Sequence, residues 1–122
     1  MEINKNIVFL GFMHGYGGAE RSMIMTANAL ANFGYNVTII SFQDNNVAYQ
    51  IDNRINYIFI PDCEGKKIRR YIYRFNRLKY MLSKLKPKVV ISFWLQPAIF
   101  SAIISKFLGF KVIYSERGDP TD

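Results

Sequence analysis

The sequence has little of what several classes of protein require. Cys63 is its one cysteine, so the 122-residue chain can build neither an internal disulfide framework nor a cysteine metal site. Its apolar runs are interrupted well before the roughly 18 residues that a membrane-spanning helix needs. Acidic Glu2 stands where a leader peptide would carry positive charge, which argues against a secretory signal. These absences predict a folded cytoplasmic protein.

Carboxylates are missing from a long central stretch. No Asp or Glu occurs between Glu64 and Glu116, whereas ten of the sixteen cations lie between Lys66 and Lys88. The formal net charge of +7 is therefore unevenly distributed, and one face of the folded protein should be positive. Such a face attracts phosphate polymers or anionic lipid head groups. A solvated helix face that only keeps the protein soluble explains the same pattern.

What is present is the composition of one folded domain, in which half of the residues are apolar. Strand patterns over residues 3–12, 36–42, 55–60, 89–93 and 111–114 alternate with helical patterns over 19–33, 66–85 and 97–108. The segment 43–54 is polar and is expected to be a loop. This order predicts an α/β domain over residues 1–122 with a Rossmann-like, doubly wound parallel sheet in three α/β/α layers.

A glycine-rich turn joins the first strand to the first helix. Gly15, Gly17 and Gly18 let the backbone approach a ligand, and the first amides of a helix attract an anion. We therefore expect the amides of residues 15–18 to be open to a phosphate group. A turn that serves only tight packing is the alternative. A nicotinamide enzyme is disfavoured because Glu20 stands where the third fingerprint glycine would fall, and no P-loop ending is present.

Unusual residues follow three of the predicted strands. In a parallel sheet these strand tips meet at the carboxyl edge, where open α/β sheets bind ligands. Each residue also has a simpler explanation, such as a loop histidine, an aromatic cap on the core or a surface ion pair. Their convergence predicts a ligand site that contains His14, Tyr16, Trp94, Gln96, Ser115, Glu116 and Arg117.

The helical window 66–85 carries most of the positive charge. Its predicted buried stripe includes Ile68, Ile72, Leu78 and Leu82, while its arginines fall mainly elsewhere. Arg70, Arg74 and Arg77 are therefore expected to form a membrane-facing or anion-binding surface. The aromatic residues of this helix permit a second interpretation, a stacking platform for single-stranded nucleic acid, but at helical spacing core packing is favoured.

Three passages resemble the amino-terminal half of a GT-B glycosyltransferase of the retaining family 4. The first runs from Gly17-Gly18-Ala19-Glu20-Arg21-Ser22 through 29–37, the second is 90–94, and the third is 112–120 with its Ser-Glu-Arg-x-x-Pro pattern. The resemblance implies two Rossmann-like domains facing across a cleft. By this resemblance we expect residues 1–122 to be the acceptor-side domain, with the nucleotide-sugar-binding carboxyl-terminal domain absent from this chain.

The resemblance also implies roles for particular residues. Gly17 and Gly18, with Tyr16, would bind the donor diphosphate. The acceptor would meet Arg21, Trp94, Gln96, Ser115, Glu116 and Arg117. Arg117, Glu116 and His14 are the catalytic candidates, although Arg117 stands where many relatives have a histidine and no general base can be assigned.

The implied activity is retaining hexosyl transfer in polysaccharide biosynthesis, without a metal or other cofactor. The substrates would be a nucleotide sugar and a glycan or lipid-linked acceptor, at the inner face of an anionic membrane. Alone, the domain should be inactive. The alternative function is a non-catalytic basic α/β module that binds phosphorylated ligands or, less expectedly, nucleic acid.

Overall fold

The computed structural model describes residues 4–13, 15, 17–45, 47 and 49–115, without the side chains of residues 43–45. The elements are β1 (Asn6–Met13), α1 (Gly18–Asn32), β2 (Asn36–Asn45), β3 (Asn56–Ile60), α2 (Lys67–Leu85), β4 (Val89–Ser92), α3 (Leu95–Leu108) and β5 (Lys111–Tyr114). Every strand pair is parallel, and the order across the sheet is β3-β2-β1-β4-β5. The predicted Rossmann-like α/β fold is confirmed.

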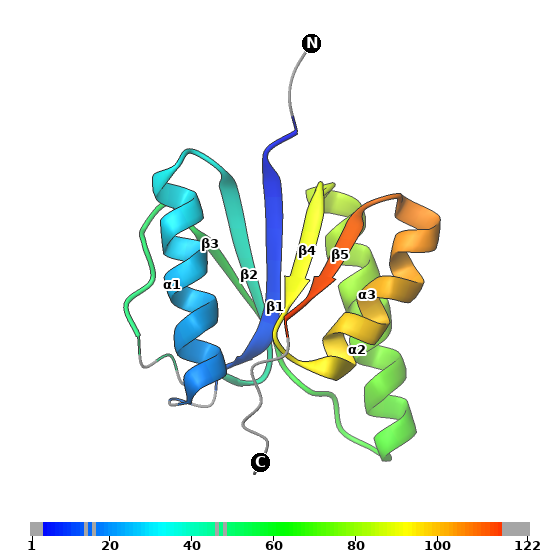
Figure 1. Ribbon diagram of the computed structural model, residues 1–122. Coiled ribbons are helices and arrows are strands. Elements are labelled where there is room, and N and C mark those ends of the chain that lie inside the picture. The colour runs from blue at the N-terminus through cyan, green and yellow to red at the C-terminus, as the bar shows by residue number, and fades with distance from the viewer. Residues whose placement is uncertain (1–3, 14, 16, 46, 48, 116–122) are drawn as a thin grey trace.

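The sheet is covered on both faces, by α1 on one side and by α2 and α3 on the other (Figure 1). Along the central strand β1, Phe9 and Met13 pack in the core beneath α1, whereas Val8 and Leu10 pack in the core beneath α2 and α3. A strand buried on both faces needs apolar side chains at successive positions. This requirement explains why β1 reads as an almost continuous apolar run.

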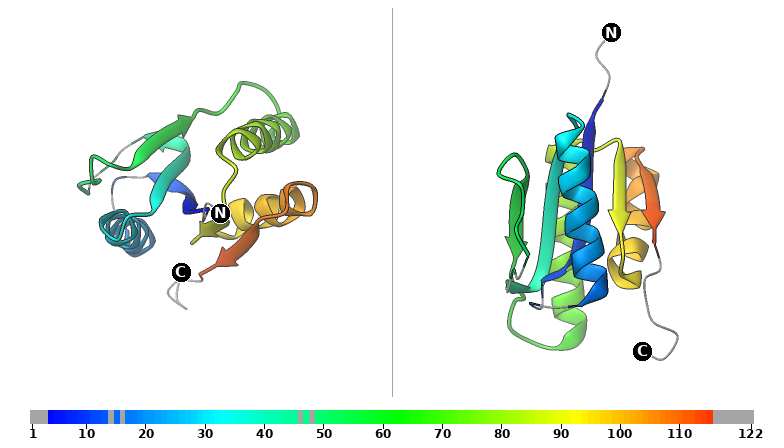
Figure 2. Two further views of the ribbon diagram at one scale, coloured as in Figure 1. Left: turned by 90° about the horizontal axis from the view of Figure 1, so that it is seen from above. Right: turned by 60° about the vertical axis from the view of Figure 1, so that its left-hand side comes forward.

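The carboxyl ends of the strands lie at one edge of the sheet, the lower edge in Figure 1, together with the amino ends of all three helices. The first turns of α2 extend past this edge (Figures 1 and 2). Right-handed crossovers between parallel strands produce this arrangement, because each helix returns the chain to the opposite edge. The arrangement gathers the turns after β1, β4 and β5, as the sequence predicts.

Two element boundaries differ from the prediction. β2 continues to Asn45, where the polar sequence predicts a loop, because its backbone stays paired with β1 beyond a register shift after Phe12. Backbone pairing thus outweighs the low strand preference of these residues. α3 begins at Leu95 rather than at Pro97. Proline is tolerated within the first helical turn, where its missing N–H would have no partner.

The phase of α2 also differs from the prediction. Ile68 and Ile72 are 69% and 57% exposed, whereas Arg74 is only 3% exposed and lies on the buried side with Leu78 and Leu82. Ile68 and Ile72 are in helical phase with the exposed Lys79, on the side of α2 that points away from the sheet. The predicted surface of Arg70, Arg74 and Arg77 is therefore wrong at Arg74.

α3 is apolar on its outer side as well as on its buried side. Leu95, Ile99, Ile103 and Phe107 recur at intervals of four residues and are between 45% and 74% exposed. Even so, none of the helices in the described part of the chain is long and apolar enough to cross a membrane.

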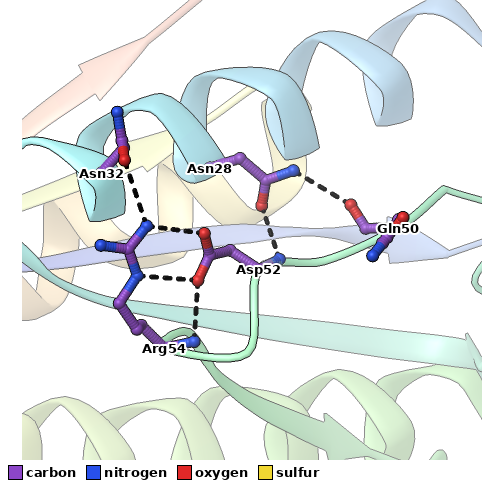
Figure 3. A network of polar contacts seen from close by, with 5 residues as sticks. All are labelled: Asn28, Asn32, Gln50, Asp52 and Arg54. Atoms are coloured by element: carbon purple, nitrogen blue, oxygen red, sulfur yellow. Dashed lines mark hydrogen bonds and ion pairs between the residues drawn. The ribbon is translucent and has the colours of Figure 1, made fainter.

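A polar network fixes the end of the segment between β2 and β3 against α1 (Figure 3). Asn28 donates to the backbone oxygen of Gln50 at 3.0 Å and accepts the N–H of Asp52 at 2.8 Å. Arg54 binds the Asp52 carboxylate through two nitrogens at 2.8 and 2.9 Å. This hydrogen bonding by Arg54 lowers the pKa of Asp52 from 3.8 to about 2. The network holds the chain that leads into β3.

Candidate functional site

α1 begins at the carboxyl edge, where no side chain among the described residues caps it. Its N-cap residue, Gly17, has a φ of 127°, a conformation that favours glycine. Gly18 is different, because its φ is not positive and a Cβ added to it would meet nothing within 4 Å. Neither strain nor packing within the described residues therefore requires glycine at position 18. The open space beside it leaves room for a ligand to approach the backbone.

The amides of Gly17 and Gly18 have no hydrogen-bond acceptor among the residues that the structure describes. The first hydrogen bond of α1 runs from the Arg21 amide to the Gly17 oxygen at 3.1 Å. Unpaired amides at the positive end of a helix dipole are a favourable environment for an anion. The two glycine amides are therefore free to bind an anion, and their binding of a phosphate stays a prediction.

Gly15 does not share this property. Its amide donates to the Glu20 carboxylate at 3.3 Å, and Glu20 is only 1% exposed. The prediction that all amides from residue 15 to 18 are open is therefore wrong at Gly15. A carboxylate in the first turn of a helix is favoured by the dipole, and here it also holds the preceding turn. Glu20 thus positions the turn, a role that the Gly-Gly-x-Glu pattern alone does not reveal.

The charge of Glu20 also acts beneath α1. Burial raises the pKa of Tyr57, its hydrogen bond with Ser41 at 2.7 Å lowers it, and the negative charge of Glu20 raises it further. Tyr57 and Ser41 lie on β3 and β2, on the sheet face that α1 covers. The charge of Glu20 therefore acts on the Tyr57 hydroxyl beneath α1.

Trp94 follows β4 and packs back onto β1. The Ser92 hydroxyl holds the turn by accepting the Trp94 N–H at 3.1 Å and donating to the Trp94 oxygen at 2.7 Å. The Trp94 ring lies over Gly11, where an added Cβ would be 2.4 Å from the ring, and meets Phe12 edge-on at 5.7 Å. Trp94 is thus half-buried and caps the core at this edge. Its contact with an acceptor stays a prediction.

Gly11 is part of this site and sequence reasoning missed it. Residues on both sides of Gly11 are large and apolar, and an isolated glycine within a strand often marks a close approach. That pattern was the available signal. The partner, Trp94, is far away in the sequence and only the fold identifies it.

A buried arginine joins three elements at the carboxyl edge. The Arg74 guanidinium of α2 donates to Asp62, just after β3, at 2.8 Å and to the side-chain oxygen of Gln96 in the first turn of α3. The rings of Phe12 and Phe42 lie 5.6 and 5.4 Å from its central carbon. Gln96, predicted to bind the acceptor, therefore has its oxygen engaged within the protein. Asp62 is a second residue that the sequence analysis missed, since Pro61-Asp62 indicated only a strand end.

The neighbouring arginines are more accessible. Arg70 lies 4.0 Å from the Asp62 carboxylate with 41% of its side chain exposed. Arg77 lies over the Tyr80 ring at 5.7 Å. These two can contact an anion outside the protein, whereas Arg74 cannot reach one without leaving its partners. The role of Arg70 and Arg77 at a membrane stays a prediction.

The remaining predicted site residues divide into two groups. Ser115 follows β5, where its amide donates to the Ser92 oxygen at 2.9 Å and continues the pairing of β4 with β5. Arg21 is exposed in the early turns of α1. His14, Tyr16, Glu116 and Arg117 lie outside the described residues. The structure therefore brings Gly17 and Gly18, the turn at Trp94–Gln96 and Ser115 to one sheet edge.

Two hollows lie at the opposite, amino edge. One of about 220 Å³ is lined by residues that include Asn6, Asn36 and Arg54, and another of about 400 Å³ includes Leu82 and Phe110. Neither contains a predicted site residue. Among the residues described, no three metal-binding side chains come together. The expectation of a metal-independent reaction stays a prediction.

Comparisons with known proteins identify the same fold and a family. The profile of Glycosyltransferase Family 4 matches residues 16–120, nearly the whole chain. An uncharacterized glycosyltransferase of Haemophilus influenzae is 40% identical over 68 residues, which are 56% of this chain and 15% of that protein. The chain thus spans a small part of that curated relative.

Two solved structures share the architecture at low sequence identity. A glycosyltransferase of Rickettsia africae matches with a TM-score of 0.71 and 19% identity, over 98% of this chain and 32% of that one. The lipopolysaccharide outer core galactosyltransferase WaaB matches with a TM-score of 0.66 and 20% identity, over 88% of this chain and 32% of that one. These likenesses establish the fold, and the chain spans about a third of each structure.

Proposed function

The chain belongs to Glycosyltransferase Family 4, and from this premise we propose that it is the acceptor-side domain of an enzyme that transfers a sugar from a nucleotide to a glycan or lipid-linked acceptor. The observation that carries the proposal is the pair of unpaired amides at Gly17 and Gly18, which lies inside the matched region. A carboxyl-terminal domain that binds the nucleotide would face this edge. The transfer would be of a hexose with retention of configuration.

The chemistry assigned to the glycine turn follows from charge. As the sugar leaves the donor, negative charge grows on the departing diphosphate. Amides that are already fixed in place stabilise that charge without reorganising, so they favour the transition state over the ground state. Gly17 and Gly18 supply the amides, α1 supplies the dipole, and Glu20 holds the preceding turn through Gly15.

The acceptor would enter along the turns after β4 and β5. Trp94 offers a partly exposed aromatic surface there, and Ser115 and Arg21 offer polar groups. Glu116, Arg117 and His14 are the candidates for contact with the reacting groups, and no general base is assigned. Because half of the cleft belongs to the other domain, this chain alone should consume nucleotide sugars at an undetectable rate. Efficient sugar transfer by the isolated chain would contradict the proposal that a second domain supplies half of the cleft.

Binding of pyrophosphate by the isolated chain tests the anion site. In ¹⁵N-resolved NMR spectra, added pyrophosphate should shift the amide signals of Gly17 and Gly18 first. A few amides without the second domain should bind weakly, with a Kd on the order of 1 mM. Uridine, which lacks phosphate, is the matched control and should leave both signals in place. Shifts confined to α2 would instead support the basic binding module and contradict the proposal.

A further inference from the structure

The outer side of α2 combines exposed apolar residues with cations. Ile68, Ile72 and Tyr80 are 69%, 57% and 51% exposed. Ile68 and Ile72 are four residues apart and therefore lie on the same side of the helix. Exposed isoleucines cost solubility, and neighbouring ones mark interaction surfaces more often than isolated ones. Ile68 and Ile72 therefore indicate a surface that contacts another apolar surface.

Cations outnumber acids around these side chains, and the acids close in sequence are Asp62 and Glu64, just before α2. α2 carries seven lysines and arginines and no Asp or Glu. Lys66, Lys67 and Arg69 are exposed at its amino end, where the positive helix dipole disfavours cations. Farther along, Lys84 lies 5.5 Å from the centre of the Tyr80 ring. An external anion would relieve the repulsion at the amino end.

We propose that this side of α2 docks onto an anionic lipid surface. We define the α2 surface as Lys66, Ile68, Arg69, Ile72, Lys79, Tyr80 and Lys84, all exposed. The isoleucines enter the head-group region, Tyr80 lies at its boundary, and the cations pair with lipid phosphates. A nucleic acid would satisfy the cations but would leave both isoleucines in water. The combination of the two chemistries therefore selects lipid.

This surface differs from the one that the sequence predicts. Arg74 is excluded because Asp62 and Gln96 hold it inside the protein. The isoleucines, predicted to be core residues, become the part that enters the lipid. The surface begins at the amino end of α2, beyond the carboxyl edge of the sheet (Figure 1). Docking would bring the edge that carries Gly17 and Gly18 close to the membrane, where a lipid-linked acceptor would lie. That last consequence rests on the proposed function, whereas the docking itself does not.

Vesicle sedimentation with the intact chain tests the cations. Vesicles that mix phosphatidylcholine with phosphatidylglycerol should bind the chain at low salt, and vesicles of phosphatidylcholine alone should not. The triple variant Lys66→Gln, Arg69→Gln, Lys79→Gln should bind the mixed vesicles about 100-fold more weakly, since each cation contributes about fivefold. The matched triple Lys5→Gln, Lys86→Gln, Lys88→Gln removes the same charge at the amino edge. Its affinity for the mixed vesicles should stay within about threefold of the wild type at an ionic strength that screens charge interactions beyond roughly 10 Å.

A second pair of variants tests the isoleucines. Ile68→Gln with Ile72→Gln should weaken vesicle binding about tenfold or more, because both side chains lose their apolar burial. Met25→Gln with Phe33→Gln removes comparably exposed apolar side chains at α1, on the opposite face of the sheet, and should leave binding unchanged. Unaltered thermal midpoints, expected at exposed positions, show that all variants fold.

Three results would overturn the docking proposal. They are equal binding to neutral and mixed vesicles, equal losses from the α2 pair and the α1 pair, and a triple variant that loses affinity for a single-stranded oligonucleotide but not for vesicles. None of these measurements involves pyrophosphate or the glycine amides. A failure of the docking proposal is therefore distinguishable from a failure of the proposed function.

Discussion

Arg74 and Asp62 form an ion pair whose two members should respond very differently to removal. The Arg74 side chain is 4% exposed, whereas 26% of the Asp62 side chain is exposed. Replacing Asp62 with alanine leaves a buried guanidinium without its counter-charge. Replacing Arg74 with methionine leaves a carboxylate that water and Arg70, 4.0 Å away, can still reach. The variant Asp62→Ala should therefore destabilise the fold more than Arg74→Met.

The magnitudes follow from these environments. Leaving a buried charge without its partner lowers the free energy of unfolding by about 3–5 kcal/mol. For Asp62→Ala the lower end, about 3 kcal/mol, applies because Gln96 and two aromatic rings still contact Arg74. Arg74→Met keeps an apolar stem between those rings and loses hydrogen bonds to a partly solvated partner, a cost of about 1.5 kcal/mol. The double variant of Asp62→Ala and Arg74→Met leaves no buried charge without a partner. It should be more stable than Asp62→Ala alone.

Urea denaturation followed by circular dichroism measures the free energies of unfolding of the three variants and the wild type. The exposed Lys111 provides the control, because Lys111→Gln should leave the urea midpoint nearly unchanged. The reasoning fails if Asp62→Ala is no less stable than Arg74→Met, or if adding Arg74→Met to Asp62→Ala lowers stability further.

Three further predictions follow from the same geometry. Gly11→Ala should destabilise the protein by about 1–3 kcal/mol and change the fluorescence of Trp94, the one tryptophan, because the new methyl group would meet its ring; an unchanged spectrum would contradict that packing. Gly17→Ala should lower the thermal midpoint because of its positive φ, whereas Gly18→Ala should leave it equal or higher; equal losses would refute the distinction. The carboxyl group of Asp52 should titrate near pH 2 in NMR spectra, so the stability it contributes is complete above about pH 4 and is lost as the pH falls through 2; a midpoint near 3.8 would refute its pairing with Arg54.

Local patterns were sufficient to predict most of the architecture. These patterns are the apolar run of β1, the helical spacing of α1 and the prolines and glycines between elements. Each of them determines the backbone conformation of residues close to it in sequence. Parallel topology then follows from the alternation of strands and helices. The position of the glycine turn at the carboxyl edge was therefore predictable, as was the convergence of Trp94 and Ser115 on that edge.

The misplaced residues depend on contacts that a pattern does not contain. Whether Ile68 is buried depends on which side of α2 packs on the sheet, and whether Arg74 is buried depends on Asp62 and Gln96, outside its own helix. The side chain of Glu20 turns back to the Gly15 amide instead of leaving it for a ligand. In each case a tertiary contact decides between two outcomes that the local sequence permits equally.

The central claim is that the Gly18 amide binds an anion, and removing that single N–H tests it most directly. Gly18→Pro deletes the donor at the first helical position, where proline is well tolerated, so the fold should persist. Leu95→Pro makes the matched change at the first position of α3 on the same sheet edge. Pyrophosphate should bind Gly18→Pro about 10- to 100-fold more weakly than the wild type, because one charge-assisted hydrogen bond is lost. Leu95→Pro should bind pyrophosphate with the affinity of the wild type. Equal pyrophosphate affinity in the wild type and Gly18→Pro would contradict the account.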